Sequence, residues 1–324
     1  MSLRDLQPLP TAAHELRDGA GIARFLAERF LAGRPALVLR YGDTGGRIMA
    51  RPSVGTPEYG YLRNFLGESV TPDQVEWIAK RIEHSVGEAD VIGLRSDLLG
   101  PEMIPGDFFT APRETLRQRL CALYPIRGID QHKLNPDGAL RLGQTRQAME
   151  AMPLPAEALL TDAWIHVSLA ENGFLSALMR HAPSIGIITS ATARNRDVMR
   201  RLYDALGERM RLYECPAYPT EERSWGGDHA WMWSRWRALV SGISPAFPGE
   251  PLLISAGIWT KVLGPAWAQA GGIAIDAGSV MDYFAGNASR PAVLATRYGA
   301  PDQVPPALGL ENQLARRELI EDFL

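Results

Sequence analysis

Three short segments of the sequence place polar residues directly after an apolar run, where a parallel strand would end. The first is Arg40-Tyr41-Gly42-Asp43. Gly42 would let the backbone approach a ligand closely, and the Asp43 carboxylate could hold a metal ion or a sugar hydroxyl. An ordinary turn explains the same residues equally well. This segment alone therefore leaves ligand binding and turn formation both open.

The second segment runs from Ser255 to Lys261 and changes from strand to glycine turn to helix. The Ser255 hydroxyl, the backbone N–H groups around Gly257 and the Lys261 ammonium would face one point, which suits a phosphate group. The spacing differs from that of a P-loop, so the segment is not a Walker motif. An ordinary strand-to-helix turn is the alternative.

The third segment contains Asp276, Gly278, Ser279 and Asp282. Asp276 would end a strand, Gly278 would permit the turn, and Ser279 could cap the helix that follows. A carboxylate just beyond a strand often orients a ribose or sugar hydroxyl. Asp282 falls in the first turn of that helix, where the helix dipole alone favours a carboxylate. A ligand role and a structural role are both open here.

Two histidines are weaker candidates for acid–base chemistry. His166 falls in an apolar run at 163–167, where a histidine is more typical of the hydrogen-bonded core than of a catalytic base. His229 follows Asp228 and could form a base–orienter pair with it. The tryptophans of 225–236 suit either carbohydrate stacking or a helix buried against a sheet, and we expect burial.

The elements that must position these residues follow from hydrophobic periodicity. Apolar runs of strand length occupy 36–40, 89–94, 163–167, 185–188, 211–213, 251–254 and 272–275. Helical spacing of apolar residues, or helix-forming composition, occupies 14–32, 71–86, 112–124, 170–181, 194–206, 229–241, 259–270 and 311–323, whereas 41–47 has the composition of a tight turn. This alternation predicts an α/β fold with a mostly parallel sheet and helices on both faces.

The same pass along the chain divides it into three parts. Residues 1–34 form a helical extension, 35–298 a single α/β domain, and 299–324 a tail with a short helix. The proline- and polar-rich stretch 125–160 is expected to be an irregular insertion or lid. We expect the tail to pack on the domain or on a second copy of the chain, as in a homodimer.

Composition excludes several classes of protein. A formal net charge of −3 over 324 residues argues against a general nucleic-acid binder, which usually carries a strong basic excess. No run approaches the roughly 20 apolar residues that a membrane span needs, and acidic residues precede the first apolar run, so no secretory signal is expected. Cys121 and Cys215 fit neither a disulfide framework nor a metal-ligand spacing. We therefore expect a cytoplasmic protein.

Parts of these segments resemble the GT-D-type glycosyltransferases, a family formerly described as a domain of unknown function. Leu37-Val-Leu-Arg40-Tyr41-Gly42-Asp43 is similar to the Arg-Phe-Gly-Asp-Gly-Glu segment that opens that family. The run 89–94 is similar to a stretch that follows the family's first long helix. The strongest similarity is that of 254–284, with its small-residue turn, lysine and Asp-x-Gly-Ser ending, to the family's closing block. The resemblance spans roughly residues 35–285.

The resemblance implies a Rossmann-like fold that transfers a sugar from a nucleotide-sugar donor to an acceptor hydroxyl, as in polysaccharide or glycoconjugate biosynthesis. In the family an Asp-x-Glu motif near the first strand engages the donor, with a divalent metal such as Mn²⁺ or Mg²⁺ implied. Asp43 matches the aspartate and would be the metal ligand. Gly45 stands where the family has glutamate. That departure puts metal dependence and turnover in question.

On this hypothesis the donor site has contributions from all three segments. The donor-binding residues would be Arg40, Gly42, Asp43, Ser255, Gly257, Lys261, Asp276, Gly278 and Ser279. A general base would come from Asp282, Asp228 or His229 if the anomeric centre inverts. We expect the loops that carry Asp43, Lys261 and Asp276 to meet around one cavity able to hold a diphosphate.

Two alternatives of different classes stay open. One is a non-catalytic nucleotide- or glycan-binding protein of the same fold, which Gly45 favours because it removes the second carboxylate. The other is a different Rossmann-type enzyme, such as a methyltransferase or dehydrogenase, which the lack of a glycine fingerprint after the first strand disfavours.

Overall fold

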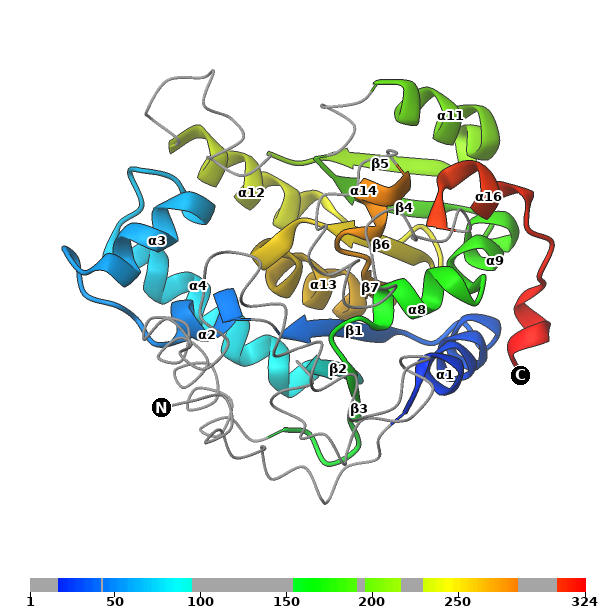
Figure 1. The fold of residues 1–324 in the computed structure, drawn as a ribbon, viewed down its shortest axis with the longest axis horizontal. Coiled ribbons are helices and arrows are strands. Elements are labelled where there is room, and N and C mark those ends of the chain that lie inside the picture. The colour runs from blue at the N-terminus through cyan, green and yellow to red at the C-terminus, as the bar shows by residue number, and fades with distance from the viewer. Residues whose placement is uncertain (1–16, 42, 95–153, 191–195, 217–229, 285–307) are drawn as a thin grey trace, which may run out of the picture.

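A computed structural model of the chain describes residues 17–41, 43–94, 154–190, 196–216, 230–284 and 308–324. Within these ranges one seven-stranded sheet has the strand order β3-β2-β1-β7-β6-β4-β5 (Figure 1). The strands are β1 (Ala36–Tyr41), β2 (Val91–Leu94), β3 (Leu159–Asp162), β4 (Ile185–Thr189), β5 (Met210–Glu214), β6 (Pro251–Ser255) and β7 (Ile273–Asp276). Every neighbouring pair is parallel. The α/β, Rossmann-like architecture expected from the sequence is confirmed.

One face of the sheet, here called the α4/α13 face, takes up Leu37, Leu39 and Tyr41 of β1. The helices that cover this face are α2 (Asp43–Met49), α3 (Pro57–Leu66), α4 (Pro72–Glu88), α12 (Ala230–Gly242) and α13 (Thr260–Gln269). Helix α4 begins with a capping box, in which Thr71 and Gln74 bond to each other's backbone N–H, and with Pro72 in its first turn.

The other face, here called the α1/α8 face, takes up Ala36 and Val38 of β1. Its covering elements are α1 (Gly19–Leu31), α8 (Ile165–Glu171), α9 (Phe174–His181), α11 (Arg196–Leu206), α14 (Val280–Phe284), α16 (Leu310–Ala315) and the 3₁₀ segment η9 (Ile320–Phe323). Because both faces are covered, the inner strands are nearly continuous apolar runs, as in other parallel sheets, whereas the edge strand β5 is only partly buried.

The strand order creates a topological switch point between β1 and β7. From β1 the chain moves outward through β2 to β3, whereas it returns from β4 and β5 through β6 to β7. The helices that follow β1 lie on the α4/α13 face, and α14, which follows β7, lies on the α1/α8 face. In open parallel sheets the crevice at such a point, outside the carboxyl ends of the strands, is the usual ligand site.

Three local predictions from the sequence are wrong. The run 163–167 is not a strand, because β3 ends at Asp162 and α8 begins at Ile165. The expected tight turn at 41–47 is the helix α2 from Asp43, and α3 was not anticipated. The expected helix 311–323 is interrupted, since α16 ends at Ala315 and η9 begins at Ile320. The expected helix 112–124 and most of the stretch 125–160 lie outside the described residues.

Two of the three tryptophans of α12 are core residues, as the sequence predicts. Trp233 and Trp236 are buried, and the Trp236 ring stacks on Trp259 with centroids 4.8 Å apart. Trp233 Nε1 donates to the Leu66 carbonyl, which joins α12 to the end of α3. Trp231 is the exposed member of the group at 41%. The indole rings of Trp233, Trp236 and Trp259 therefore pack α12 against the turn that precedes α13, on the α4/α13 face.

The C-terminal segment packs on the α1/α8 face. Gln313 of α16 is fully buried, donates to the Ala170 carbonyl at 2.8 Å and accepts from the Ser176 hydroxyl. Phe323 of η9 meets Phe174 edge-on at 5.3 Å. The C-terminus lies beside α1 and α9 at one side of the molecule (Figure 1).

We expect Gln313→Leu to lower the free energy of unfolding by about 1–3 kcal/mol, because it removes the acceptor of the buried Ser176 hydroxyl and the side-chain donor to the Ala170 carbonyl. Urea unfolding followed by circular dichroism measures this change. Asn312→Ala, an exposed position in the same helix, is the matched control and should stay within about 0.5 kcal/mol of the wild type. Equal effects of the two substitutions would mean that α16 is not anchored through Gln313.

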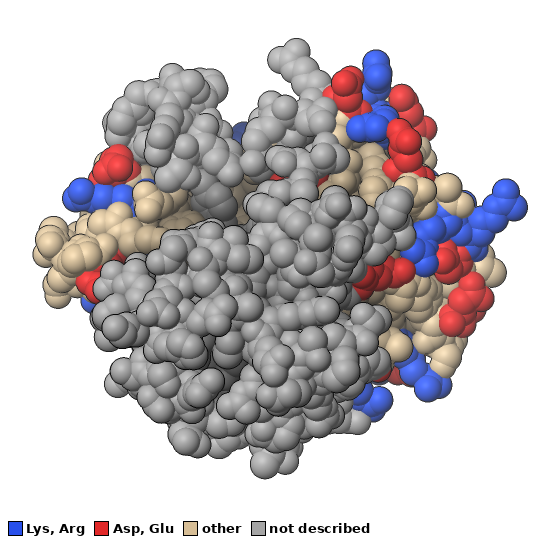
Figure 2. Space-filling view, in the orientation of Figure 1, with Lys and Arg blue, Asp and Glu red and all other residues tan. Residues whose placement is uncertain are grey.

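The surface carries mixed charge. On the face shown in Figure 2, Lys and Arg side chains are interspersed with Asp and Glu over the described residues. None of the described helices combines the length and apolar character that crossing a bilayer requires.

Candidate functional site

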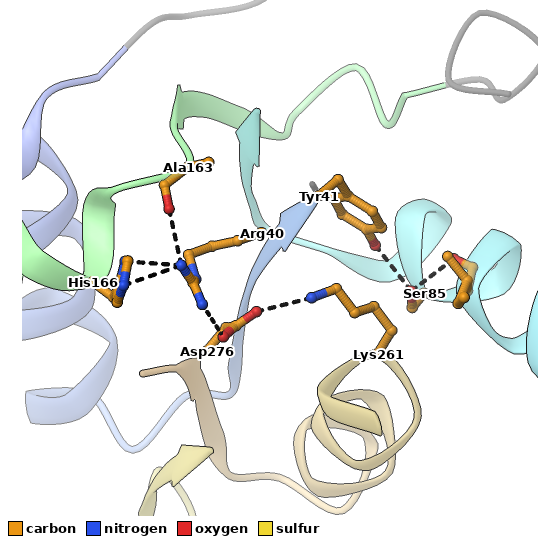
Figure 3. Close-up of polar contacts among 8 residues, drawn as sticks. Arg40, Tyr41, Ser85, Ala163, His166, Lys261 and Asp276 are labelled. Carbon is orange, nitrogen blue, oxygen red and sulfur yellow. Dashed lines mark hydrogen bonds and ion pairs between the residues drawn. The ribbon is translucent and has the colours of Figure 1, made fainter. Parts of the chain in front are cut away.

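A buried carboxylate held between two cations lies at the switch point. Asp276 at the end of β7 is 2% exposed. Its Oδ1 accepts a hydrogen bond from Arg40 Nη2 at 2.8 Å, and its Oδ2 accepts one from Lys261 Nζ at 2.9 Å (Figure 3). Arg40 is in β1 and Lys261 is in the first turn of α13. Residues from all three predicted segments are thus close together, and two of them contact Asp276 directly.

The register of the central strands explains why these side chains meet. Val38 pairs with Ile275, so Arg40 and Asp276 both lie at the carboxyl end of the β1–β7 pair. Helix α13 lies close over these strands because Gly264 has no side chain; a Cβ there would be 2.9 Å from Leu37 Cδ1. This close packing brings Lys261 to Asp276 from the α4/α13 face, whereas Arg40 reaches it from the α1/α8 side.

Two glycines make room for the Arg40 side chain. Gly278 has a left-handed backbone, with φ at +43°, and a Cβ at this position would be 1.9 Å from Arg40 Nη2. A Cβ on Gly93, in the neighbouring strand β2, would be 3.1 Å from Arg40 Cγ. The turn after β7 therefore needs glycine for its own conformation and also for the position of the guanidinium.

Arg40 also contacts the start of α8. Its Nη1 donates to the Ala163 carbonyl at 3.1 Å and lies 3.0 Å from His166 Nδ1 (Figure 3). His166 is fully buried, and its Nε2 lies 3.1 Å from the Ser279 hydroxyl. Ser279 is therefore connected to Arg40 through His166, not by direct contact.

The protonation of Asp276 and Lys261 reflects burial and mutual attraction. Burial opposes ionisation of Asp276, but Arg40 and Lys261 together outweigh it, so the pKa of Asp276 lies below its ordinary value of 3.8. For Lys261, burial outweighs the attraction of Asp276 and Arg40 adds repulsion, so the pKa of Lys261 lies below its ordinary value of 10.5. The group has two basic side chains, Arg40 and Lys261, for the one carboxylate of Asp276.

Tyr41 forms the apolar wall beside Lys261. The Lys261 Nζ lies 5.7 Å from the centroid of the Tyr41 ring, within cation–π range. The Tyr41 hydroxyl is 2.9 Å from Ser85 Oγ, which in turn donates to the Ile82 carbonyl of α4. Burial raises the pKa of Tyr41, so its hydroxyl stays neutral and anchors the end of β1 to α4.

Helix α2 brings the first segment against the second. A Cβ on Gly45 would lie 4.0 Å from Ile258 Cδ1, an ordinary van der Waals contact. Ile258 belongs to the 3₁₀ turn η6 (Gly257–Trp259), between β6 and α13. The backbone of Asp43 begins α2, but its side chain, like all of Gly42, lies outside the described residues. The expected meeting with Asp43 therefore stays a prediction.

The remaining predicted residues occupy the same edge of the sheet. Ser255 ends β6, and Gly257 adopts a left-handed backbone with φ at +55° in the turn that follows. The N–H groups of Ala277 and Gly278 both donate to the Ile254 carbonyl, so the ends of β6 and β7 are joined. Asp282 is half-buried in α14, and its backbone N–H donates to the Ser279 carbonyl.

One further prediction is untested, and one residue of the run 89–94 has a structural role. His229 and Asp228 lie outside the described residues, so the base–orienter pair is untested. Asp90, in the stretch similar to the GT-D family, lies at the amino edge of the sheet, opposite the site. Its Oδ2 accepts from the Leu37 N–H at 2.8 Å. We interpret Asp90 as fixing the start of β1.

The described residues do not themselves compose a metal site. Both carboxylate oxygens of Asp276 accept hydrogen bonds from cations, and Gly45 supplies no side-chain ligand where the resemblance would put one. Within the described ranges no group of three or more His, Cys, Asp or Glu side chains is placed to hold a metal ion. We therefore assign no chemical step to a metal.

Sequence reasoning missed two features of the site. His166 was expected in the core of a strand, but it lies in α8 and connects Arg40 to Ser279. Asp162, which ends β3 and accepts from the Trp164 N–H at 2.7 Å, was not singled out. An aspartate three residues before a helix start is a turn signal. Here it indicates where β3 ends and α8 begins.

No protein-family model, curated protein or solved structure matches this chain.

Proposed function

We propose that the protein is a glycosyltransferase that binds the diphosphate of a nucleotide-sugar donor at the Arg40–Asp276–Lys261 group. The observation that carries this proposal is the pair of cations around Asp276 at the β1–β7 switch point. The reaction, transfer of a sugar from the donor, is inferred from the resemblance of the flanking segments to GT-D-type enzymes. The acceptor would be a hydroxyl of a glycan or glycoconjugate.

The two cations retain hydrogen-bonding capacity for an anion. A lysine ammonium has three N–H groups and an arginine guanidinium has five, and Asp276 takes one from each. Arg40 Nε is buried and has no hydrogen-bond partner within the described part of the chain. A diphosphate at the mouth of this site would meet a net positive charge, with Asp276 keeping both cations in place.

These groups would act on the leaving group. As the glycosidic bond to the nucleotide breaks, negative charge grows on the diphosphate, and cations held in advance near it stabilise that charge most in the transition state. Lys261 and Arg40 would fill this role. The backbone N–H groups at the start of α13, after Ser255 and Gly257, favour the same charge through the helix dipole. Asp282 is the described candidate for a general base.

Isothermal titration with UDP, GDP, ADP and dTDP, with and without Mn²⁺, tests the donor site. We expect one of these nucleotides to bind, and Lys261→Met to weaken its affinity by about tenfold or more, as loss of a charged hydrogen bond does. Lys80→Met is the matched control, because Lys80 is 69% exposed on α4 and pairs with Glu76. If the wild type bound none of these nucleotides, the proposed function would be wrong.

Gly45 distinguishes transfer from binding without transfer. The non-catalytic alternative is favoured by the glycine that stands where the resembled family has a carboxylate. Gly45 is buried, and a Cβ there would lie 4.0 Å from Ile258 Cδ1, so circular dichroism must first show that Gly45→Glu folds like the wild type. If the wild type is a binding protein that lost turnover, Gly45→Glu should release nucleoside diphosphate from nucleotide sugars at a measurable rate, whereas the wild type should not. Turnover by the wild type, unchanged or lowered in Gly45→Glu, would instead support a transferase that works with Gly45.

A further inference from the structure

A buried histidine next to the cation group has no part in the donor site described above. His166 is fully buried at the start of α8, between Arg40 and Ser279. The Arg40 Nη1 lies 3.0 Å from its Nδ1 and 3.2 Å from its Nε2, and the Ser279 hydroxyl lies 3.1 Å from its Nε2. The geometry of these three contacts restricts the protonation of the imidazole ring.

Arginine can only donate, so the ring nitrogen that meets Arg40 must be the unprotonated acceptor. Nη1 lies 3.0 Å from Nδ1 and 3.2 Å from Nε2, so we assign Nδ1 as the acceptor and place the ring proton on Nε2. The Nε2–H group then donates to the Ser279 oxygen. The opposite tautomer would direct Nδ1–H at the guanidinium N–H groups, and a doubly protonated ring would place an imidazolium against them. The arrangement in which Arg40 donates to Nδ1 of His166 and Nε2–H of His166 donates to Ser279 satisfies both neighbours.

This arrangement determines what Ser279 can do. Because the Ser279 oxygen accepts from His166, the hydroxyl proton is directed toward a different acceptor. Ser279 lies three residues after Asp276, at the carboxyl edge of the sheet, and is 8% exposed. An acceptor that enters beside Arg40 and Lys261 would be an anionic oxygen, since both neighbours are cationic.

We propose that His166 is a positioning residue that fixes the Ser279 hydroxyl as a hydrogen-bond donor to a phosphate oxygen of the bound diphosphate. This inference rests on the proposed function and extends it to a residue outside the cation group. It assigns Ser279 to recognition of the ligand and His166 to the orientation of that donor. His166 itself makes no contact with the ligand and transfers no proton.

The tautomer can be tested without any ligand. Long-range ¹H–¹⁵N spectra of protein labelled at histidine, with His166 assigned from its absence in His166→Gln, distinguish the two ring nitrogens. At about pH 7.5, where an ordinary histidine is mostly neutral, we expect an unprotonated Nδ1 and a protonated Nε2. A ring protonated on Nδ1, or on both nitrogens, would overturn the proposal whatever the protein binds.

The link to the ligand is tested by a double-mutant cycle of His166→Phe and Ser279→Ala. The readout is affinity for inorganic pyrophosphate and for the nucleoside diphosphate that binds the wild type. We expect each single variant to weaken binding by about tenfold to about a hundredfold. The double variant should be no weaker than Ser279→Ala, because His166 acts through that hydroxyl. Independent, multiplying effects would overturn the positioning role.

Rescue separates positioning from a structural role. The amide of glutamine can place an N–H near the position of Nε2, so His166→Gln should recover most of the affinity that His166→Phe loses. If affinity only follows thermal stability across His166→Phe and His166→Gln, His166 supports the fold alone and the proposal is overturned. If the wild type binds no diphosphate, the proposed function and the role of Ser279 are both wrong. If the wild type binds a diphosphate but the effects of His166→Phe and Ser279→Ala on affinity are independent, only the role of His166 is wrong.

Discussion

Replacing Asp276 with asparagine should lower the free energy of unfolding by about 3–5 kcal/mol, because it leaves two buried cations without their shared counter-charge. Arg40 and Lys261 both bond to this carboxylate, and their side chains are 18% and 8% exposed. Asparagine keeps the shape but supplies a single carbonyl acceptor, and its amide N–H₂ would face the other cation. Guanidinium unfolding curves of the two proteins measure the loss.

A surface aspartate gives the matched control. Asp197 is 72% exposed and lies 3.5 Å from Arg200, so Asp197→Asn should change stability by less than about 1 kcal/mol. Adding Lys261→Met to Asp276→Asn should restore part of the lost stability, because it removes one of the two stranded charges. If the free energy of unfolding of Asp276→Asn were within about 1 kcal/mol of the wild-type value, the carboxylate would not be the counter-ion of these cations.

The effect of Asp276→Asn should also depend on pH. The pKa of Asp276 is lower in the folded protein than its ordinary value of 3.8. The ionised carboxylate therefore contributes stability that is present above that value and is lost as the pH falls through the folded-state pKa. We expect the difference between wild type and Asp276→Asn to stay level from about pH 8 to about pH 5 and to shrink below about pH 4. A difference that grows in acid would contradict this assignment.

Gly278→Ala should have the second large effect, through two separate causes. Its left-handed backbone disfavours any side chain, at a cost of about 1–3 kcal/mol. The new Cβ would also lie 1.9 Å from Arg40 Nη2, so the guanidinium must leave its position beside Asp276. We therefore expect a loss of stability greater than backbone strain alone gives, together with loss of diphosphate binding.

Gly207 separates the two causes. It also has a left-handed backbone, with φ at +56°, but a Cβ there would meet nothing within 4 Å. Gly207→Ala should therefore show the backbone cost alone and leave ligand affinity unchanged. Thermal unfolding and titration calorimetry on both variants give the comparison. Equal losses of stability in the two variants would mean that Arg40 adapts to a side chain at position 278 without cost.

The sequence predicts most of the sheet because burial on both faces leaves a simple signal. Runs such as 185–188 and 251–254 are short, apolar and bounded by loops, and each is a strand in the structure. The run 163–167 has the same composition but follows Asp162, whose side chain accepts the Trp164 N–H. That side-chain bond ends the strand, and the apolar residues beyond it form α8. Hydrophobicity alone cannot distinguish a buried strand from a short buried helix.

The site was predictable in part, for a related reason. Residues at the carboxyl ends of parallel strands come together in any arrangement of the sheet that makes those strands neighbours, so Arg40, Lys261 and Asp276 could be grouped. Which strands are neighbours does not follow from periodicity. The contact of His166 with Arg40 joins residues 126 positions apart in the chain, and it depends on α8 crossing the end of β1. The role of His166 could therefore be recognised only in three dimensions.

The pairing of β1 with β7 also has a consequence for synthesis of the chain. Arg40 and Asp276 are 236 positions apart. The edge of β1 that pairs with β7 therefore stays uncovered during synthesis until β7 has left the ribosome. Until then the apolar edge of β1 is available to other chains, and contacts of such long range form slowly. Affinity for an anion at Arg40 would consequently arise only in the final stage of folding, and a nascent chain cut before β7 should aggregate rather than bind.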